Sequence, residues 1–139
     1  TPFPVHHMHG KDSISHEMAS NNTFGYLLEH NGKKVAYLAD YYELPPESIA
    51  LIQGSDVIIA DGTYLLEEYF PAKPEQIGEK NDSDHLHGQK ILDFAHSLNA
   101  KRVIFHSITH LSEKMHDEMV RHFPSGFEPG YDGLEITFD

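Results

Sequence analysis

The chain contains no cysteine among its 139 residues. This excludes disulfide bonds, thiolate metal ligands and a cysteine nucleophile. It also fits a reducing compartment, so we expect the protein in the cytoplasm. No apolar run approaches the roughly 18 residues of a membrane span, and no signal-peptide pattern is present. We therefore expect no membrane partner.

Positive charge is also scarce, because 10 Lys and Arg residues stand against 22 Asp and Glu, for a net charge of −12. A groove that follows a phosphate backbone needs clustered Lys and Arg, so this balance disfavours nucleic acid as a partner. Histidine is abundant instead, with 12 residues dispersed along the chain. Since imidazole is the commonest metal ligand and acid–base group near neutral pH, this composition favours a metal site or acid–base chemistry.

A turn at Asn31-Gly32 lies between two apolar runs. Both turn positions of such a hairpin need positive φ, which Asn and Gly tolerate. The pattern predicts antiparallel strands over residues 23–30 and 33–39. The second strand delivers Asp40 to the edge of the sheet.

The remaining pattern predicts a layered α/β fold of one domain, with helices on one face of a mixed sheet. Met115, Met119 and Val120 form the apolar stripe of the last helix and are expected in the core. The expected elements are an extended segment 2–7, a loop 8–22, a helix from Leu44 to Gly54, a strand 56–61, a loop 62–83, helices 87–98 and 112–122, and strands 102–106 and 134–138.

Polar residues of the metal-ligand type stand at the ends of apolar strands, where ligands collect in open α/β sheets. Imidazole and carboxylate together suit zinc, and manganese or iron are also possible. Three of these residues could have a purely structural role. Asp40 could be a turn or cap residue, Asp61 a turn residue, and His106 a hydrogen-bonded core histidine. The positions are His6-His7, Asp40, Asp61 and His106.

His85 stands just before a predicted helix, in the run Asp82-Ser83-Asp84-His85. A general acid, an anion contact and a metal ligand are all open roles, since a helix N-terminus favours anions. The plainer alternative is an exposed histidine in a capping cluster.

Four segments together resemble the C-terminal half of the metallo-β-lactamase superfamily, above all its PhnP-type cyclic phosphodiesterases of carbon–phosphorus lyase metabolism, which are relatives of ribonuclease Z. The resemblance implies half of an αββα sandwich. The segments are Phe24-Gly25-Tyr26-Leu27-Leu28-Glu29, Val35-Ala36-Tyr37-Leu38-Ala39-Asp40, Asp56-Val57-Ile58-Ile59-Ala60-Asp61, and the run from Pro124 to Ile136.

The resemblance implies two divalent metal ions, zinc or manganese with iron possible. By position, His7 resembles a histidine that binds one metal, and Asp40 resembles the aspartate that bridges both. His106 resembles the last ligand, with His110 as its alternative because the surrounding pattern is offset by one residue. The loop after His7 is long, so His6, His9 and His16 stay open for that ligand.

Two further residues carry over as catalytic groups. His85 resembles the histidine that assists the leaving group or the phosphate, and Asp61 the acidic residue that supports it. Glu67, Glu68 and other acidic residues of the nearby loop would repel RNA. We therefore expect a phosphodiesterase that acts on a small phosphodiester through metal-activated water. A tRNA-processing nuclease, a thioester or lactone hydrolase, and an inactive metal-binding or assembly half-domain are the alternatives.

The family signature His-x-His-x-Asp-His is missing, and His7-Met8-His9-Gly10-Lys11-Asp12 only imitates it. We therefore expect residues 1–139 to be the C-terminal portion of a domain whose N-terminal half is absent. We expect a metallo-hydrolase when the domain is complete; for this chain alone activity stays open. The uncovered sheet face would then drive either homo-oligomerisation or pairing with the missing half.

Overall fold

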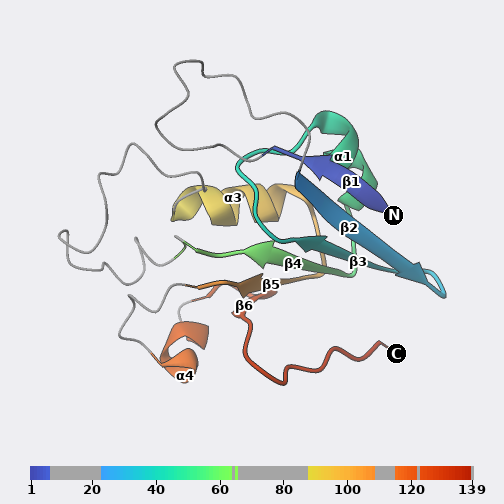
Figure 1. Cartoon of the computed structure of the whole chain (residues 1–139). Coiled ribbons are helices and arrows are strands. Elements are labelled where there is room, and N and C mark those ends of the chain that lie inside the picture. The colour runs from blue at the N-terminus through green and yellow to red at the C-terminus, as the bar shows by residue number, and fades with distance from the viewer. Residues whose placement is uncertain (7–22, 64, 66–87, 109–114, 122, 139) are drawn as a thin grey trace, which may run out of the picture.

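A computed structural model describes residues 1–6, 23–63, 65, 88–108, 115–121 and 123–138 (Figure 1). The expected loop 8–22, nearly all of the loop after Thr63 and parts of the helix 112–122 lie outside these residues.

The described residues form a six-stranded sheet in the order β1-β2-β3-β4-β5-β6. β1, β2 and β3 pair antiparallel, whereas β3 to β6 pair parallel. The predicted mixed α/β architecture is therefore confirmed. The strands are β1 (Pro2–Val5), β2 (Thr23–His30), β3 (Lys33–Leu38), β4 (Val57–Asp61), β5 (Arg102–His106) and β6 (Phe127–Pro129).

The hairpin forms where the sequence predicts it. Asn31 and Gly32 have φ values of 48° and 74°, the left-handed conformation that this turn needs. The turn sets the register of β2 on β3, in which Leu27 pairs with Ala36. Both side chains are buried, so the register places one face of the hairpin in the core.

Two helices, α1 (Pro46–Ile52) and α3 (Gln89–Ser97), cover one face of the sheet (Figure 1). Their apolar residues pack with those of the strands in a single cluster. None of the described helices is long and apolar enough to cross a membrane. The fully buried members of the core include Leu38, Ile52, Ile58, Ile91, Val103 and Phe105.

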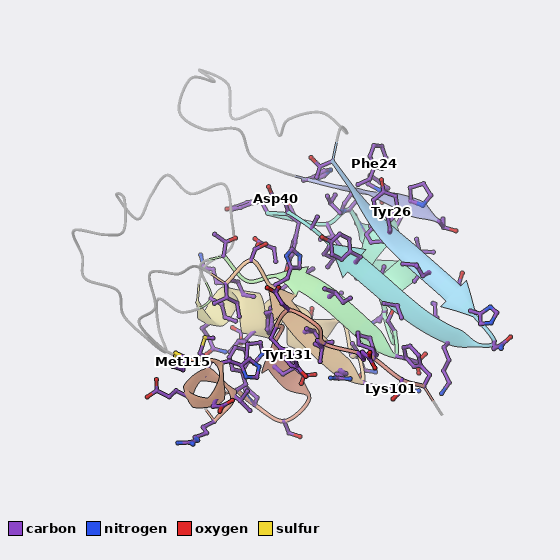
Figure 2. All side chains as sticks on the ribbon, turned by 60° about the horizontal axis from the view of Figure 1, so that its bottom comes forward. Phe24, Tyr26, Asp40, Lys101, Met115 and Tyr131 are labelled. Carbon is purple, nitrogen blue, oxygen red and sulfur yellow. The ribbon has the colours of Figure 1, made fainter. Side chains whose placement is uncertain are left out.

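The other face of the hairpin is exposed and apolar. Phe24, Tyr26 and Leu28 alternate along β2 and are 44%, 51% and 59% exposed. Tyr37 and Val35 lie opposite Tyr26 and Leu28 on β3, so they belong to the same face. Figure 2 shows Phe24 and Tyr26 together on this side. We call these five residues the open face.

Two predictions about the C-terminal region are wrong. Residues 134–138 form no strand; the last strand is β6, which pairs with β5 through Val103 and Phe127. Helix α4 (His116–Val120) contains no buried residue, and Met115 before it is 74% exposed. The apolar stripe predicts burial in the core, but α4 contacts the sheet mainly at β6.

Candidate functional site

The carboxyl ends of β3, β4 and β5 meet at one edge of the sheet, because these strands are adjacent and parallel. Asp61 pairs directly with His106 across β4 and β5. Leu38 pairs with Ala60, so Asp40 follows the end of β3 at the same edge. Figure 2 shows Asp40 there. Three candidate residues are thus delivered to one rim of the sheet.

The ring of His106 is held on both nitrogens. Its Nε2 lies 3.1 Å from the carbonyl oxygen of Leu38, which can only accept, so Nε2 carries the proton. Nδ1 then accepts from the hydroxyl of Ser107 at 2.7 Å. The ring stacks on Tyr37 with centroids 5.3 Å apart. A metal-binding histidine usually donates the N–H of its other ring nitrogen to a carbonyl in this way. Nδ1 of His106 is then the atom that could coordinate a metal once the Ser107 hydroxyl rotates away.

Asp61 is 5% exposed and is fixed by the residue two positions later. The hydroxyl and the amide of Thr63 both donate to Oδ1 of Asp61, at 2.7 and 3.2 Å. Thr63 is not among the site residues predicted from the sequence. The spacing of Asp61 and Thr63 in the sequence could have indicated it, because an Asp with a hydrogen-bond donor two residues later is typical of an Asx turn.

Tyr41, directly after Asp40, was also missed. Its ring is fully buried and contacts Phe94 of α3, with centroids 5.5 Å apart. Burial, and to a lesser degree the negative charge of Asp61, raises the pKa of the Tyr41 hydroxyl above its ordinary value. The hydroxyl therefore stays neutral at physiological pH.

The end of β1 is tied to the segment that follows Asp40. The amide of His6 donates to the carbonyl of Glu43 at 2.8 Å, and the amide of Tyr42 donates to the carbonyl of His6 at 2.7 Å. Among the described residues, nothing bonds the buried Nδ1 of His6. His7 comes next in the chain, but His7 itself lies outside the described residues, as do His85 and His110.

The donor types at this rim fit a divalent cation, because carboxylate and imidazole are both present. Within the ranges that the structure describes, no three His, Asp or Glu side chains group as a metal site. Asp40 and His106 bring two donors of a suitable type to this rim. The ligand roles themselves stay predictions.

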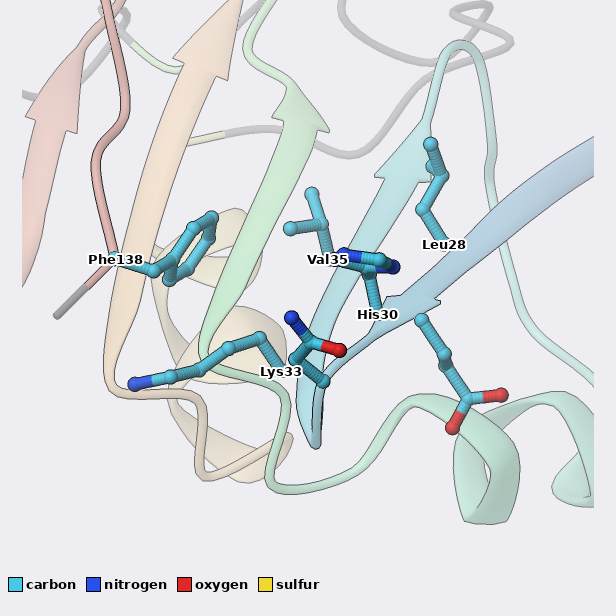
Figure 3. Close-up of a pocket in the computed structure, with 7 residues that line it drawn as sticks. Leu28, His30, Lys33, Val35 and Phe138 are labelled. Atoms are coloured by element: carbon cyan, nitrogen blue, oxygen red, sulfur yellow. The ribbon is translucent and has the colours of Figure 1, made fainter.

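A pocket of about 460 Å³ lies away from this rim, at the end of the open face next to the hairpin turn (Figure 3). Lys33 and Phe138 contribute to it, with the Lys33 Nζ 5.9 Å from the centre of the Phe138 ring. Lys33 begins β3 and Asp40 follows its end, so this pocket is at the opposite end of the strand from the rim. Its lining residues are Leu28, Glu29, His30, Asn31, Lys33, Val35 and Phe138.

Comparison with known families gives a match to the beta-lactamase superfamily domain over residues 1–108. The chain belongs to the beta-lactamase superfamily. The predicted family resemblance is thereby confirmed, together with the fold class.

Individual relatives of this beta-lactamase superfamily chain are distant. Coenzyme PQQ synthesis protein B of Methylobacillus flagellatus is 28% identical over 131 residues, which cover 87% of this chain and 42% of that protein. A crystal structure titled as a new diphosphatase from the PhnP family has a TM-score of 0.64 and 25% identity, over 99% of this chain and 42% of the other. Zinc-bound PqqB from Methylobacterium extorquens has a TM-score of 0.70 and 22% identity, over 99% and 50%. The chain thus spans half or less of the length of these relatives.

Proposed function

We propose that this chain carries the C-terminal half of the active site of a metal-dependent phosphodiesterase that hydrolyses a small phosphodiester. The observation that carries the proposal is the delivery of Asp40, Asp61 and His106 to one rim by adjacent parallel strands. The similarity to a PhnP-family diphosphatase and to a zinc-bound protein supports phosphate chemistry and a divalent metal.

The residues that would hold two cations, zinc or manganese with iron possible, are His7, Asp40 and His106, with His110 as the alternative to His106. When bound, such cations lower the pKa of water toward neutrality and offset charge on phosphate oxygens. Asp40 would supply the carboxylate of this ligand set. The bond from His106 to the Leu38 carbonyl keeps the proton on Nε2, so Nδ1 would be the nitrogen that binds a cation.

His85 would protonate the leaving alkoxide, and Asp61 would fix the orientation of that imidazole. The burial of Asp61 suits this role, because a carboxylate withdrawn from water interacts more strongly with an imidazole. The net charge of −12 disfavours RNA as substrate.

In the protein expressed from its native gene, two substitutions separate metal binding from proton transfer. Asp40→Ala should remove bound metal and lower turnover of bis(p-nitrophenyl) phosphate by about 100-fold or more, since even groups that only orient metal ligands are worth about 10–100-fold. His85→Ala should lower turnover by about 10²–10⁴-fold with metal content unchanged. The controls are Asp132→Ala in an exposed turn and His30→Ala at the hairpin.

The result against the proposal is equally specific. Full metal content and turnover in Asp40→Ala would remove the rim from the chemistry. Cleavage of structured tRNA with a steep salt dependence, and no hydrolysis of small diesters, would favour the nuclease alternative.

We also propose that the open face is covered by the part of the protein that corresponds to the rest of the relatives' length. Structural similarity covers 99% of this chain but only 42–50% of the two solved structures. An uncovered apolar face of aromatic side chains is a typical interaction surface. Sedimentation of residues 1–139 with and without a co-expressed preceding segment tests this proposal. A stable heterocomplex supports it, and a homodimer unaffected by that segment contradicts it.

A further inference from the structure

The turn after β4 holds one carboxylate oxygen with two donors from the same residue. The Thr63 hydroxyl donates to Oδ1 of Asp61 at 2.7 Å and the Thr63 amide at 3.2 Å. A carboxylate oxygen has two lone pairs, so Thr63 alone can satisfy Oδ1. Neither of these two bonds involves Oδ2.

The turn itself is anchored on both sides. The amide of Gly62 donates to the carbonyl of His106 at 2.8 Å, and the amide of Leu65 donates to the carbonyl of Gly62 at 3.0 Å. The side chain of Leu65 is fully buried, so the exit of the turn is fixed in the core. Thr63 therefore acts from a backbone that is tied to the strand carrying His106.

We infer that Thr63 is a positioning residue, which sets the rotamer of Asp61 so that Oδ2 is directed to the reacting groups at the rim. This inference rests on the proposed function, because it gives Thr63 a role through Asp61. Orienting hydrogen bonds of this kind are worth about 10–100-fold in activity or metal affinity. The structure also predicts which atom matters: the hydroxyl of Thr63, not its methyl group.

A pair of substitutions isolates that atom. Thr63→Val keeps the shape of the side chain and removes the hydroxyl, whereas Thr63→Ser keeps the hydroxyl and removes the methyl group. In the protein expressed from its native gene, Thr63→Val should lower kcat on bis(p-nitrophenyl) phosphate by about 10–100-fold with little change in KM. Thr63→Ser should restore most of the loss.

Ser55 provides a matched control at the other end of β4. Its hydroxyl is buried and donates to the carbonyl of Ile52 at 2.6 Å, so Ser55→Ala removes a similar bond far from the rim. Ser55→Ala should lower the melting temperature without lowering kcat. A kcat in Thr63→Val equal to that of wild type would overturn the inference, as would equal losses in the Val and Ser variants.

A double substitution tests whether Thr63 acts through Asp61. If it does, Thr63→Val should change kcat less than about twofold in an Asp61→Ala background, since coupled residues are not additive. Additive effects would overturn the inference. The failure of the proposed function looks different: wild type itself would hydrolyse no phosphodiester. The Thr63–Asp61 coupling is then read from urea midpoints of the same four proteins, where additive shifts contradict it.

Discussion

Gly62 directly follows Asp61, and its amide donates to the carbonyl of His106 at 2.8 Å. Its replacement by alanine should therefore lower stability and displace the residues of the rim. A Cβ built at Gly62 would lie 3.0 Å from Cβ of Phe105 and 3.2 Å from the carbonyl oxygen of His106. Neither atom is the end of a flexible side chain. The end of β4 must therefore move away from β5 by a few tenths of an ångström.

The magnitude follows from this crowding. Overpacking a well-packed site costs about 1–3 kcal/mol in the free energy of unfolding. For a chain of this size that corresponds to a melting temperature lower by roughly 3–12 °C. Because a misplacement of about 1 Å can cost about 10²-fold in rate, a smaller shift of Asp61 should lower kcat by about tenfold.

Gly133→Ala is the matched control. Gly133 has a φ of +87° and a Cβ there would meet nothing within 4 Å, so alanine costs only backbone strain of about 1–2 kcal/mol. We expect both variants to melt early in differential scanning calorimetry, but only Gly62→Ala to lose turnover. A Gly62→Ala protein with the melting temperature and the turnover of wild type would refute the packing argument.

Two further predictions concern other parts of the sheet. Two hydrogen bonds lower the pKa of the Asp56 carboxyl: first that from the Lys101 ammonium at 2.7 Å, then that from the Lys34 amide at 2.8 Å. The stability that ionised Asp56 adds to the fold is therefore complete above about pH 4, the ordinary pKa of an aspartate. It is lost as the pH falls through the lowered pKa. In urea titrations, the stability difference between wild type and Asp56→Asn should be constant from pH 5 to 8 and shrink below pH 4; a difference that persists to pH 2 contradicts this. Tyr41→Phe should be neutral or stabilising by up to about 1–3 kcal/mol in thermal melts, because no described residue bonds the buried hydroxyl, and a clear loss of stability would mean that this hydroxyl has a partner.

The C-terminal region illustrates where the sequence misleads. Residues 134–138 have the composition of a strand, yet a strand exists only where a neighbouring strand offers its edge. β5 offers that edge to Phe127–Pro129, a segment flanked by Pro124 and Gly130 that reads as a turn. Proline is acceptable at such an edge position because its missing donor faces no partner.

Helix α4 misleads for a related reason. An apolar stripe predicts burial only when a surface lies opposite it. Within the described residues, α4 contacts the sheet mainly along its edge strand β6, so no surface among them covers Met115 and Val120, which are exposed.

The sequence by itself determined what local rules govern: the Asn31-Gly32 turn, the buried strands, and the placement of Asp40, Asp61 and His106 at strand ends. Tertiary structure alone decided which of these residues are neighbours, because strand pairing joins positions as far apart as Asp61 and His106. It also decided the contacts that give those residues a fixed orientation. The bond from His106 to the Leu38 carbonyl spans 68 residues, and no local pattern encodes a hydrogen bond over that separation.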